Sequence, residues 1–400
     1  MLKLFRQLSI LLGGLILLAV FAGCSSVPKR QPLPEELSGS AVIPGIPNAR
    51  FWGDEWPAYS RELVNNLKDE DVRNSYPAIY GKPHNYLAIS GGGSNGAFGA
   101  GLLAGWAAAG TRPEFTMVTG ISTGALTAPF AFLGPEYDDL LKQVYTTTRT
   151  EDIIIQRNLA SAAMGDSAAD TTPLRALIAQ LVDDKIVEAI GQEYNKGRQL
   201  FIGTMNLDAG REVIWNIGKI AASQDPGRRT LIHSIMLASA SIPVAFPPVM
   251  IPVEADGKAF DELHVDGGTG TQVFVYPAAI NWKKMLQLLH VPEPPSVYVI
   301  RNSTIQPEYS STDRNIISIA GRSISSLIRT QGIGDLYQIY LLCQRDGSSY
   351  NLAYIPDDID FKPSEPFDPV YMGKLYELGY GKGLSGDAWQ HKPPGFVAGE

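Results

Sequence analysis

The chain has 400 residues, of which 44% are hydrophobic and 18% charged, with a formal net charge of -8. This composition is typical of a globular protein that buries a large core. Such an acidic chain lacks the basic face that nucleic acids require, so no nucleic-acid partner is expected. The negative charge also argues against attachment to anionic lipid by charge alone, so membrane contact requires another device.

The first 23 residues supply such a device, because they have the pattern of a secretory signal peptide. Lys3 and Arg6 precede an uncharged apolar run from Leu8 to Ala22. The run is short for a transmembrane helix, which needs ~20 apolar residues. A positive region, an apolar region of this length and a boundary of small residues predict a segment that is cleaved from the mature protein.

The end of this segment, Phe21-Ala22-Gly23-Cys24, resembles the lipobox of bacterial lipoproteins. That resemblance implies that residues 1–23 are removed and that Cys24 becomes a lipidated N-terminus in the membrane. Phe21 departs from the usual leucine-like residue, and a plain signal anchor or an ordinary secretory signal is the alternative. Ser26 stands where an aspartate would favour retention in the inner membrane. The expected location is therefore extracytoplasmic, on the outer membrane facing the periplasm in a two-membrane bacterium.

Residues 24–82 are rich in proline, serine and polar residues, which predicts a tether followed by an irregular lead-in. The chain has two cysteines. With Cys24 lipidated, Cys343 has no partner for an intramolecular disulfide. Because Cys343 lies in an apolar stretch, we expect a small buried side chain rather than a catalytic thiol.

A glycine-rich turn follows the first clear strand. Residues 86–90 are apolar and predict a buried strand, residues 97–109 predict a helix, and Gly91-Gly92-Gly93-Ser94 lies between them. Three glycines let backbone amides converge on one point, and the helix N-terminus adds partial positive charge. The turn therefore predicts a site for an anion or a developing oxyanion.

The same turn satisfies the dinucleotide fingerprint G-x-G-x-x-G through Gly91, Gly93 and Gly96. A dinucleotide site also needs an acidic residue at the end of the second strand, whereas Glu114 precedes the next apolar run. The chain has no phosphate-binding P-loop motif. A nucleotide site and a purely structural turn remain the lesser alternatives.

The next strand leads into a nucleophile motif. Residues 115–119 predict a strand, and Gly120-Ile121-Ser122-Thr123-Gly124 precedes a helix-like segment at 125–133. G-x-S-x-G between a strand and a helix is the nucleophile elbow, whose glycines Gly120 and Gly124 keep other side chains away from the serine. Ser122 is therefore the candidate nucleophile.

A serine needs a neighbouring base. Asp266 ends a short predicted strand and is followed by Gly267 and Gly268, so its carboxylate can face the serine. A plain Asp-Gly turn is the alternative interpretation. A histidine-dependent hydrolase would instead use His290 or His391, which both lie in predicted loops.

Taken together, these three motifs resemble the patatin-like phospholipase family in order and spacing. The resemblance covers about residues 86–302, including the segment 238–248, which is similar to the family's site-lining segment. It implies a Ser122–Asp266 dyad, with the amides of Gly91, Gly92, Gly93 and Ser94 binding the oxyanion. The chain departs from the family at Asn95, where many members carry Arg or Lys.

The resemblance also implies a lipid acyl hydrolase that cleaves carboxylic esters of membrane lipids, phospholipids among them, without a metal or a cofactor. A non-catalytic lipid-binding or scaffold lipoprotein with the same fold is the alternative function. His264, two residues before Asp266, either faces the site or is structural.

The expected fold is an α/β/α sandwich of three layers with a mostly parallel central sheet. Residues 83–302 are the predicted catalytic core, and residues 303–400 complete the domain with helices. Residues 296–300 predict another buried strand near the end of the core. After the core, residues 316–343 predict two helices interrupted near Gly332-Ile333-Gly334, and residues 372–380 predict a last helix.

Overall fold

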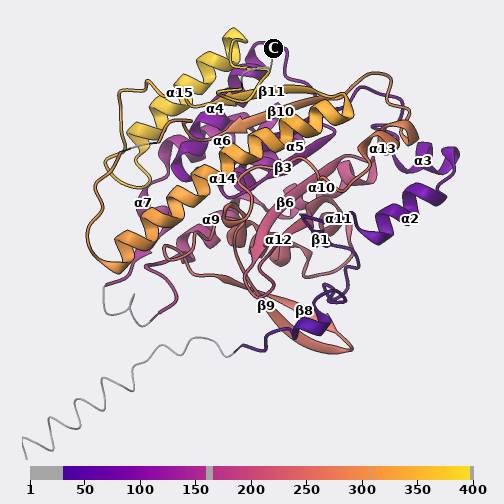
Figure 1. Ribbon diagram of the computed structural model, residues 1–400, viewed down its shortest axis with the longest axis horizontal. Helices are drawn as coiled ribbons and strands as arrows, with labels where there is room; N and C mark the ends of the chain where they lie inside the picture. Colours follow the sequence, from indigo (N-terminus) through magenta and orange to yellow (C-terminus); the bar gives the residue numbers. More distant parts are fainter. Residues whose placement is uncertain (1–29, 159–164, 308, 397–400) are drawn as a thin grey trace, which may run out of the picture.

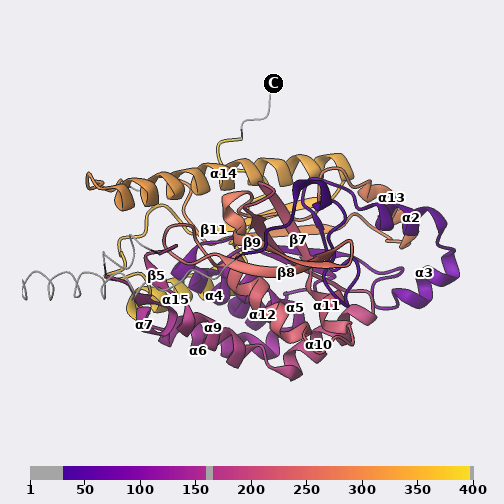
Figure 2. The ribbon, with the colours of Figure 1, turned by 90° about the horizontal axis from the view of Figure 1, so that it is seen from below.

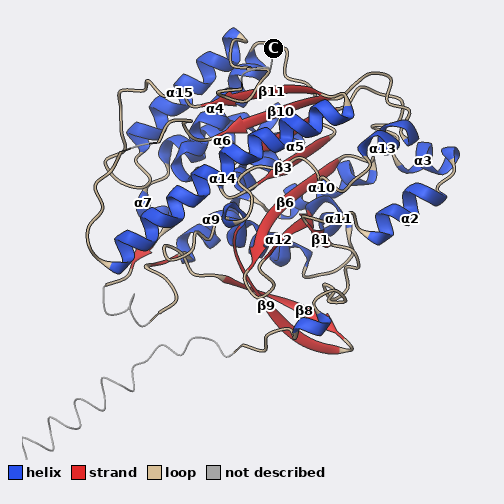
Figure 3. Cartoon of the chain, in the orientation of Figure 1, coloured by secondary structure: helices blue, strands red, loops and turns tan. Residues whose placement is uncertain are grey.

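The computed structural model of the chain describes residues 30–158, 165–307 and 309–396 (Figure 1). A nine-stranded sheet crosses its centre, with helices packed on both faces (Figures 1 and 2). Figure 3 shows the same layers by secondary structure. The predicted α/β/α architecture is therefore confirmed.

Five neighbouring strands, which reach from the middle of the sheet to one edge, are parallel. In spatial order they are β6 (Gln199–Asn206), β3 (Met117–Gly120), β2 (Asn85–Ile89), β10 (Ser296–Arg301) and β11 (Ser349–Tyr354). The strands predicted before both glycine motifs and at 296–300 are thereby confirmed as β2, β3 and β10. Because parallel strands place their carboxyl ends at one edge, the loops after β2 and β3 meet there.

Four antiparallel strands extend the sheet on the β6 side. They are β1 (Arg50–Trp52), β7 (Arg211–Asn216), β8 (Val249–Ala255) and β9 (Lys258–Asp266). β1 lies in the predicted lead-in and pairs with β7, with Arg50 opposite Trp215, so the lead-in contributes a strand to the sheet. A separate pair, β4 (Ile155–Gln156) and β5 (Ala169–Asp170), forms a small second sheet.

Helices cover the two faces of the sheet unequally (Figure 2). One face carries α13 (Trp282–Leu288) and α14 (Ile316–Asp346). The other face carries α4 (Gly96–Ala108), α5 (Thr123–Leu133), α6 (Asp138–Thr147), α9 (Thr172–Leu181), α10 (Asp184–Asn195), α11 (Ile217–Ala222), α12 (Arg228–Ser239) and α15 (Pro369–Ser385). The remaining α-helices are α2 (Ala58–Asn66), α3 (Asp69–Ser75) and α7 (Thr150–Ile153). No helix of the described residues is both long and apolar enough to span a membrane.

The strands direct alternate side chains to these two faces. On β2, Leu87 and Ile89 pack into the core under α4 and α5, while Tyr86 and Ala88 pack under α14. All four side chains are buried. A central strand that is apolar on both faces is typical of a parallel sheet covered by helices on both sides.

Residues 316–346 form one continuous helix, α14, so the predicted break near Gly332 is wrong. A glycine costs a helix only about 1 kcal/mol relative to alanine, which packing can outweigh. At Gly332 a Cβ would lie 2.7 Å from Nη1 of Arg301 and 3.1 Å from Cβ of Gln272. The glycine thus lets α14 approach the end of β10, and Cys343 near the helix end is buried as predicted.

Helices α4 and α15 pack backbone against backbone. A Cβ on Gly101 or Gly105 would lie 2.0 Å from the carbonyl oxygen of Tyr376 or Tyr380, respectively. Gly379 and Gly383 of α15 meet α4 equally closely, at 2.1 Å and 2.3 Å from carbonyl oxygens. Paired glycines four residues apart therefore fix α4, whose N-terminus follows the glycine-rich turn.

Candidate active site

Ser122 occupies the tight turn between β3 and α5, with φ +54° and ψ -123°. A non-glycine residue with positive φ is strained, as expected of a nucleophile elbow. The two motif glycines permit the turn. A Cβ on Gly120 would lie 2.4 Å from the carbonyl oxygen of Gly124, and one on Gly124 would lie 2.2 Å from that of Ile89.

The backbone amide of Ser122 is held by a residue from α12. It donates to Oγ of Ser239 at 3.0 Å, and this hydroxyl donates in turn to the carbonyl oxygen of Gly203 at 2.7 Å. Ser239 is fully buried. Sequence reasoning placed Ser239 in the site-lining segment 238–248 but gave it no role, because a serine that contacts a backbone amide 117 positions away leaves no local pattern.

Asp266 ends β9 directly beside Ser122. Its carboxylate accepts a hydrogen bond from the amide of Gly268 at 2.7 Å, and the Ser122 side chain is near enough to lower its pKa. Burial raises the pKa of Asp266 to about 7, although Ser122 and the amide of Gly268 act in the opposite direction. A carboxyl group with this pKa is a much stronger proton acceptor than an exposed aspartate.

The glycines after Asp266 make room for this arrangement. A Cβ on Gly267 would lie 2.6 Å from the carbonyl oxygen of Gly203, and one on Gly268 would lie 2.0 Å from Nε2 of Gln272. The following loop is tied down by α14, since the amide of Gln272 donates to the buried carboxylate of Asp335 at 2.6 Å.

The glycine-rich turn faces Ser122 from the end of β2. The amide of Gly91 donates to the carbonyl oxygen of Gln272 at 3.3 Å, so it is occupied. The amides of Gly92, Gly93 and Ser94 have no acceptor among the residues that the structure describes. Gly93 has φ +58°, the left-handed region that favours glycine. Of the four residues predicted for the oxyanion loop, three thus present an amide that is free to bind a ligand.

Gly91 lacks a side chain and so leaves room for Ser122 and Gln272. A Cβ at this position would lie 3.1 Å from Cβ of Ser122 and 2.9 Å from Oε1 of Gln272. Asn95, where the chain departs from the family pattern, accepts a hydrogen bond from the Tyr371 hydroxyl of α15 at 2.8 Å.

Asn302 holds the glycine-rich turn and the start of α4 through hydrogen bonds. This role was not predicted from the sequence. The Asn302 side chain accepts from the amide of Gly99 at 3.1 Å and donates to the carbonyl oxygen of Ser90 at 3.0 Å. The signal that could have revealed it is its position, since it is a polar residue directly after the buried strand β10.

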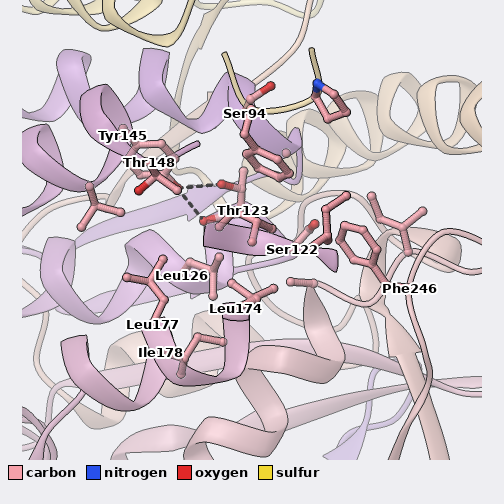
Figure 4. A pocket seen from close by; sticks show the side chains of 18 of the residues that line it. Ser94, Ser122, Thr123, Leu126, Tyr145, Thr148, Leu174, Leu177, Ile178 and Phe246 are labelled. Atoms are coloured by element: carbon pink, nitrogen blue, oxygen red, sulfur yellow. Dashed lines mark hydrogen bonds between the residues drawn. The ribbon is translucent and has the colours of Figure 1, made fainter. Parts of the chain in front are cut away.

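A largely apolar cavity of about 630 Å³ opens beside Ser122 (Figure 4). Leu126 of α5 and Leu174, Leu177 and Ile178 of α9 line it, with Phe246 near Ser122. At its polar side, the Tyr145 hydroxyl hydrogen-bonds Oγ1 of Thr123 at 2.6 Å and Oγ1 of Thr127 at 2.9 Å. Pockets of this volume suit a ligand of lipid or drug size.

Residues 87–279 match the model of a known family, described as patatin-like phospholipase. This segment is similar to a patatin-like phospholipase domain. The matched range contains the glycine-rich turn, Ser122 and Asp266, so the resemblance expected from the motifs is confirmed.

Two solved structures are similar to this chain over much of its length. VipD from Legionella pneumophila is 11% identical, with 77% of this chain and 67% of VipD covered and a TM-score of 0.38. The type III effector protein ExoU is 12% identical, with 76% of this chain and 53% of ExoU covered and a TM-score of 0.22. A comparison with curated protein sequences gave no match. The domain match and the observed sheet order carry the fold assignment.

In the part of the chain that the structure describes, no histidine ring nitrogen hydrogen-bonds Ser122. The ring nitrogens of His84 contact Tyr86 and Ile79, and those of His233 contact Val182. His290 contacts Asp69, and His391 contacts Tyr350. His264 is fully buried and contacts Thr204 at 2.9 Å and Glu262 at 3.2 Å. The predicted signal peptide and Cys24 lie outside the described residues.

Proposed function

We propose that this chain is a serine hydrolase that cleaves carboxylic esters of membrane lipids, with Ser122 as nucleophile and Asp266 as its base. The observation that carries this proposal is the position of Ser122, which occupies a strained elbow that lines an apolar cavity and lies beside the buried Asp266. The patatin-like domain supports lipid hydrolysis as the general activity.

In the proposed first step, Oγ of Ser122 attacks the ester carbonyl carbon while Asp266 accepts the hydroxyl proton. The amides of Gly92, Gly93 and Ser94 stabilise the negative charge that develops on the carbonyl oxygen. Asp266 then returns the proton to the departing alcohol, which leaves an acyl group on Ser122.

The second step releases the acid. Asp266 accepts a proton from a water molecule that attacks the acyl carbon. It then returns this proton to Oγ of Ser122 as the bond between Oγ and the acyl carbon breaks, which releases the acid and restores the serine hydroxyl. The acyl chain occupies the apolar cavity during both steps. The cavity is lined by leucine, isoleucine and phenylalanine side chains, which remove the acyl chain from water. Each buried CH₂ group contributes about 0.8 kcal/mol, which favours long acyl chains.

We also propose that the protein is anchored to the membrane through a lipid on Cys24, following the pattern Phe21-Ala22-Gly23-Cys24. Mass spectrometry of the mature N-terminal peptide tests this anchor. A lipid-modified Cys24 as the first residue is expected, whereas an intact Met1 or an unmodified Cys24 would contradict it.

Covalent labelling tests the catalytic proposal against a non-catalytic lipid-binding protein. A fluorophosphonate probe should label the full chain at Ser122, and Ser122→Ala should prevent labelling. Asp266→Asn should slow labelling strongly, since the serine then lacks its proton acceptor. A chain that stays unlabelled, or that is labelled at another serine, would contradict the assignment.

A further inference from the structure

The first half of α14, residues 316–330, is a helical segment in which none of the described side chains is buried. Its apolar residues nevertheless recur at helical spacing: Ile316, Ile319, Ala320, Ile324, Leu327 and Ile328. Three of them, Ile316, Ile319 and Leu327, are between 52% and 83% exposed. A helical stripe of apolar side chains facing solvent marks a surface that contacts something else.

This stripe lies at the same edge of the sheet as the active site. Helix α14 follows β10, α15 follows β11 and Ser122 follows β3, and these three strands are parallel. Both views of the ribbon place the start of α14 and α7 toward one end of the molecule (Figures 1 and 2), and Figure 2 shows β5 at the same end.

Two further exposed apolar side chains belong to this end. Ile155 on β4 is 56% exposed and Val370 at the start of α15 is 70% exposed. Each is close in sequence to the cavity lining, since Gln156 and Phe367 both line the cavity. Gln156 is itself exposed, so the cavity reaches the surface at this end.

The charges around the stripe indicate what covers it. Arg322 lies about 60° around the helix from Ile319 and about 140° from Leu327, at 100° per residue, so it flanks the stripe. From residue 309 to residue 330 the charged side chains are Asp313, Arg314, Arg322 and Arg329, so this segment is locally basic. An apolar stripe flanked by arginines is typical of helices that lie in the headgroup region of a bilayer. Because the net charge is -8, insertion of apolar side chains has to supply most of the attraction.

We propose that Ile155, Ile316, Ile319, Leu327 and Val370 form a docking surface that inserts into a lipid bilayer and brings the mouth of the cavity against the membrane. A lipid acyl chain can then enter the cavity without crossing water. The docking surface is separate from the Cys24 anchor. It extends the proposed function, but bilayer contact itself does not require catalysis.

Position-specific fluorescence on the full chain tests the docking surface directly. An environment-sensitive thiol probe is attached to Ile316→Cys, Ile319→Cys or Leu341→Cys, with the unsubstituted chain as the labelling blank. Vesicles of phosphatidylcholine and phosphatidylglycerol carry a nitroxide on the acyl chain. Leu341 is the matched control, because it is 62% exposed on the same helix and lies roughly 37 Å from Ile316 along the helix axis.

Probes at 316 and 319 should be quenched at least about three-fold more than the probe at 341, since only the docking end enters the bilayer. Tethering through the N-terminus alone would leave all three probes in water and would overturn the proposal. Equal quenching at 316 and 341 would also contradict it. Probes at 316 and 319 that are already in an apolar environment without vesicles would contradict the proposal as well. A second copy or another segment of the chain would then cover the docking surface.

A second experiment separates docking from catalysis. The combined variant Ile316→Ser, Ile319→Ser and Leu327→Ser should lower hydrolysis of vesicle lipid about ten-fold or more, with an unchanged rate on a short water-soluble ester. The matched control, Leu341→Ser with Leu384→Ser, should retain both rates. Equal loss on both substrates would overturn the docking role. If the unsubstituted chain hydrolyses neither substrate, the proposed function fails and probe quenching still decides the docking surface.

Discussion

The amide of Ser122 donates to Oγ of Ser239, 3.0 Å away, so a serine of α12 holds the nucleophile's strained turn. Ser239→Ala should leave this buried amide without an acceptor, at a cost of about 1–3 kcal/mol in stability. We expect kcat to fall as well, because the position of Ser122 relative to Asp266 is loosened. Thermal unfolding and ester hydrolysis measure both effects.

The control for this variant is Ser241→Ala. The Ser241 hydroxyl is equally buried but donates only to the carbonyl oxygen of Leu237, one turn earlier in the chain. Its loss should leave kcat near the unsubstituted value. Equal losses of kcat in the two variants would indicate a general packing effect at the end of α12.

The pH dependence of hydrolysis should report the state of Asp266. Because the pKa of Asp266 is raised to about 7, the base is protonated in acid and becomes active as the pH rises through 7. On a soluble ester, kcat/KM should therefore rise to a plateau with a midpoint near pH 7. A midpoint near 4, typical of an exposed aspartate, would show that burial does not govern this carboxyl group.

Ionisation of the buried Asp266 should also lower the free energy of unfolding at alkaline pH. The pKa of Asp266 is about 7 in the folded chain against an ordinary value of 3.8, so the folded state holds the proton more tightly than the unfolded state. The stability from this proton is present below pH 4 and is lost as the pH rises through 7. The asparagine in Asp266→Asn has no proton to lose. At pH 8 this variant should therefore be more stable than the unsubstituted chain by up to about 4 kcal/mol.

Denaturant unfolding at pH 5 and pH 8 checks this prediction. The advantage of Asp266→Asn should be greater at pH 8, while activity is lost at both pH values. The exposed Asp139→Asn serves as the control, because it removes no buried charge. A destabilised Asp266→Asn at pH 8 would contradict burial of an ionised carboxylate.

The cavity should select acyl chains by length. Leu177 of α9 lies on the far side of the cavity from Ser122 (Figure 4). Leu177→Phe adds volume there and should reduce hydrolysis of long-chain esters about ten-fold or more, while short-chain esters are cleaved normally. Competition between long and short esters in one reaction measures the ratio. An unchanged ratio would mean that the acyl chain lies elsewhere.

The local parts of the site could be predicted from the sequence. The turn at Ser122 requires glycines at fixed positions, and the steric contacts of Gly120 and Gly124 show why. The strands before both motifs were predictable for a similar reason, since a parallel strand covered on both faces is a short apolar run.

The supporting contacts could not be predicted, because they join residues far apart in the chain. Asn302 and Gly99 are separated by 203 positions, and a polar residue after a strand has many possible partners. The continuity of α14 was missed because its glycines were taken as breakers. Gly332 instead allows close packing against Arg301, a tertiary contact that outweighs helix propensity.

Fatty-acid release from mixed phospholipid vesicles by the full chain, with Ser122→Ala and Asp266→Ala alongside, tests the central claim most directly. We predict clear release by the unsubstituted chain and a loss of at least about a thousand-fold in each variant, both remaining folded. Release that persists in Ser122→Ala, or an unsubstituted chain no faster than that variant, would contradict catalysis by the Ser122–Asp266 pair.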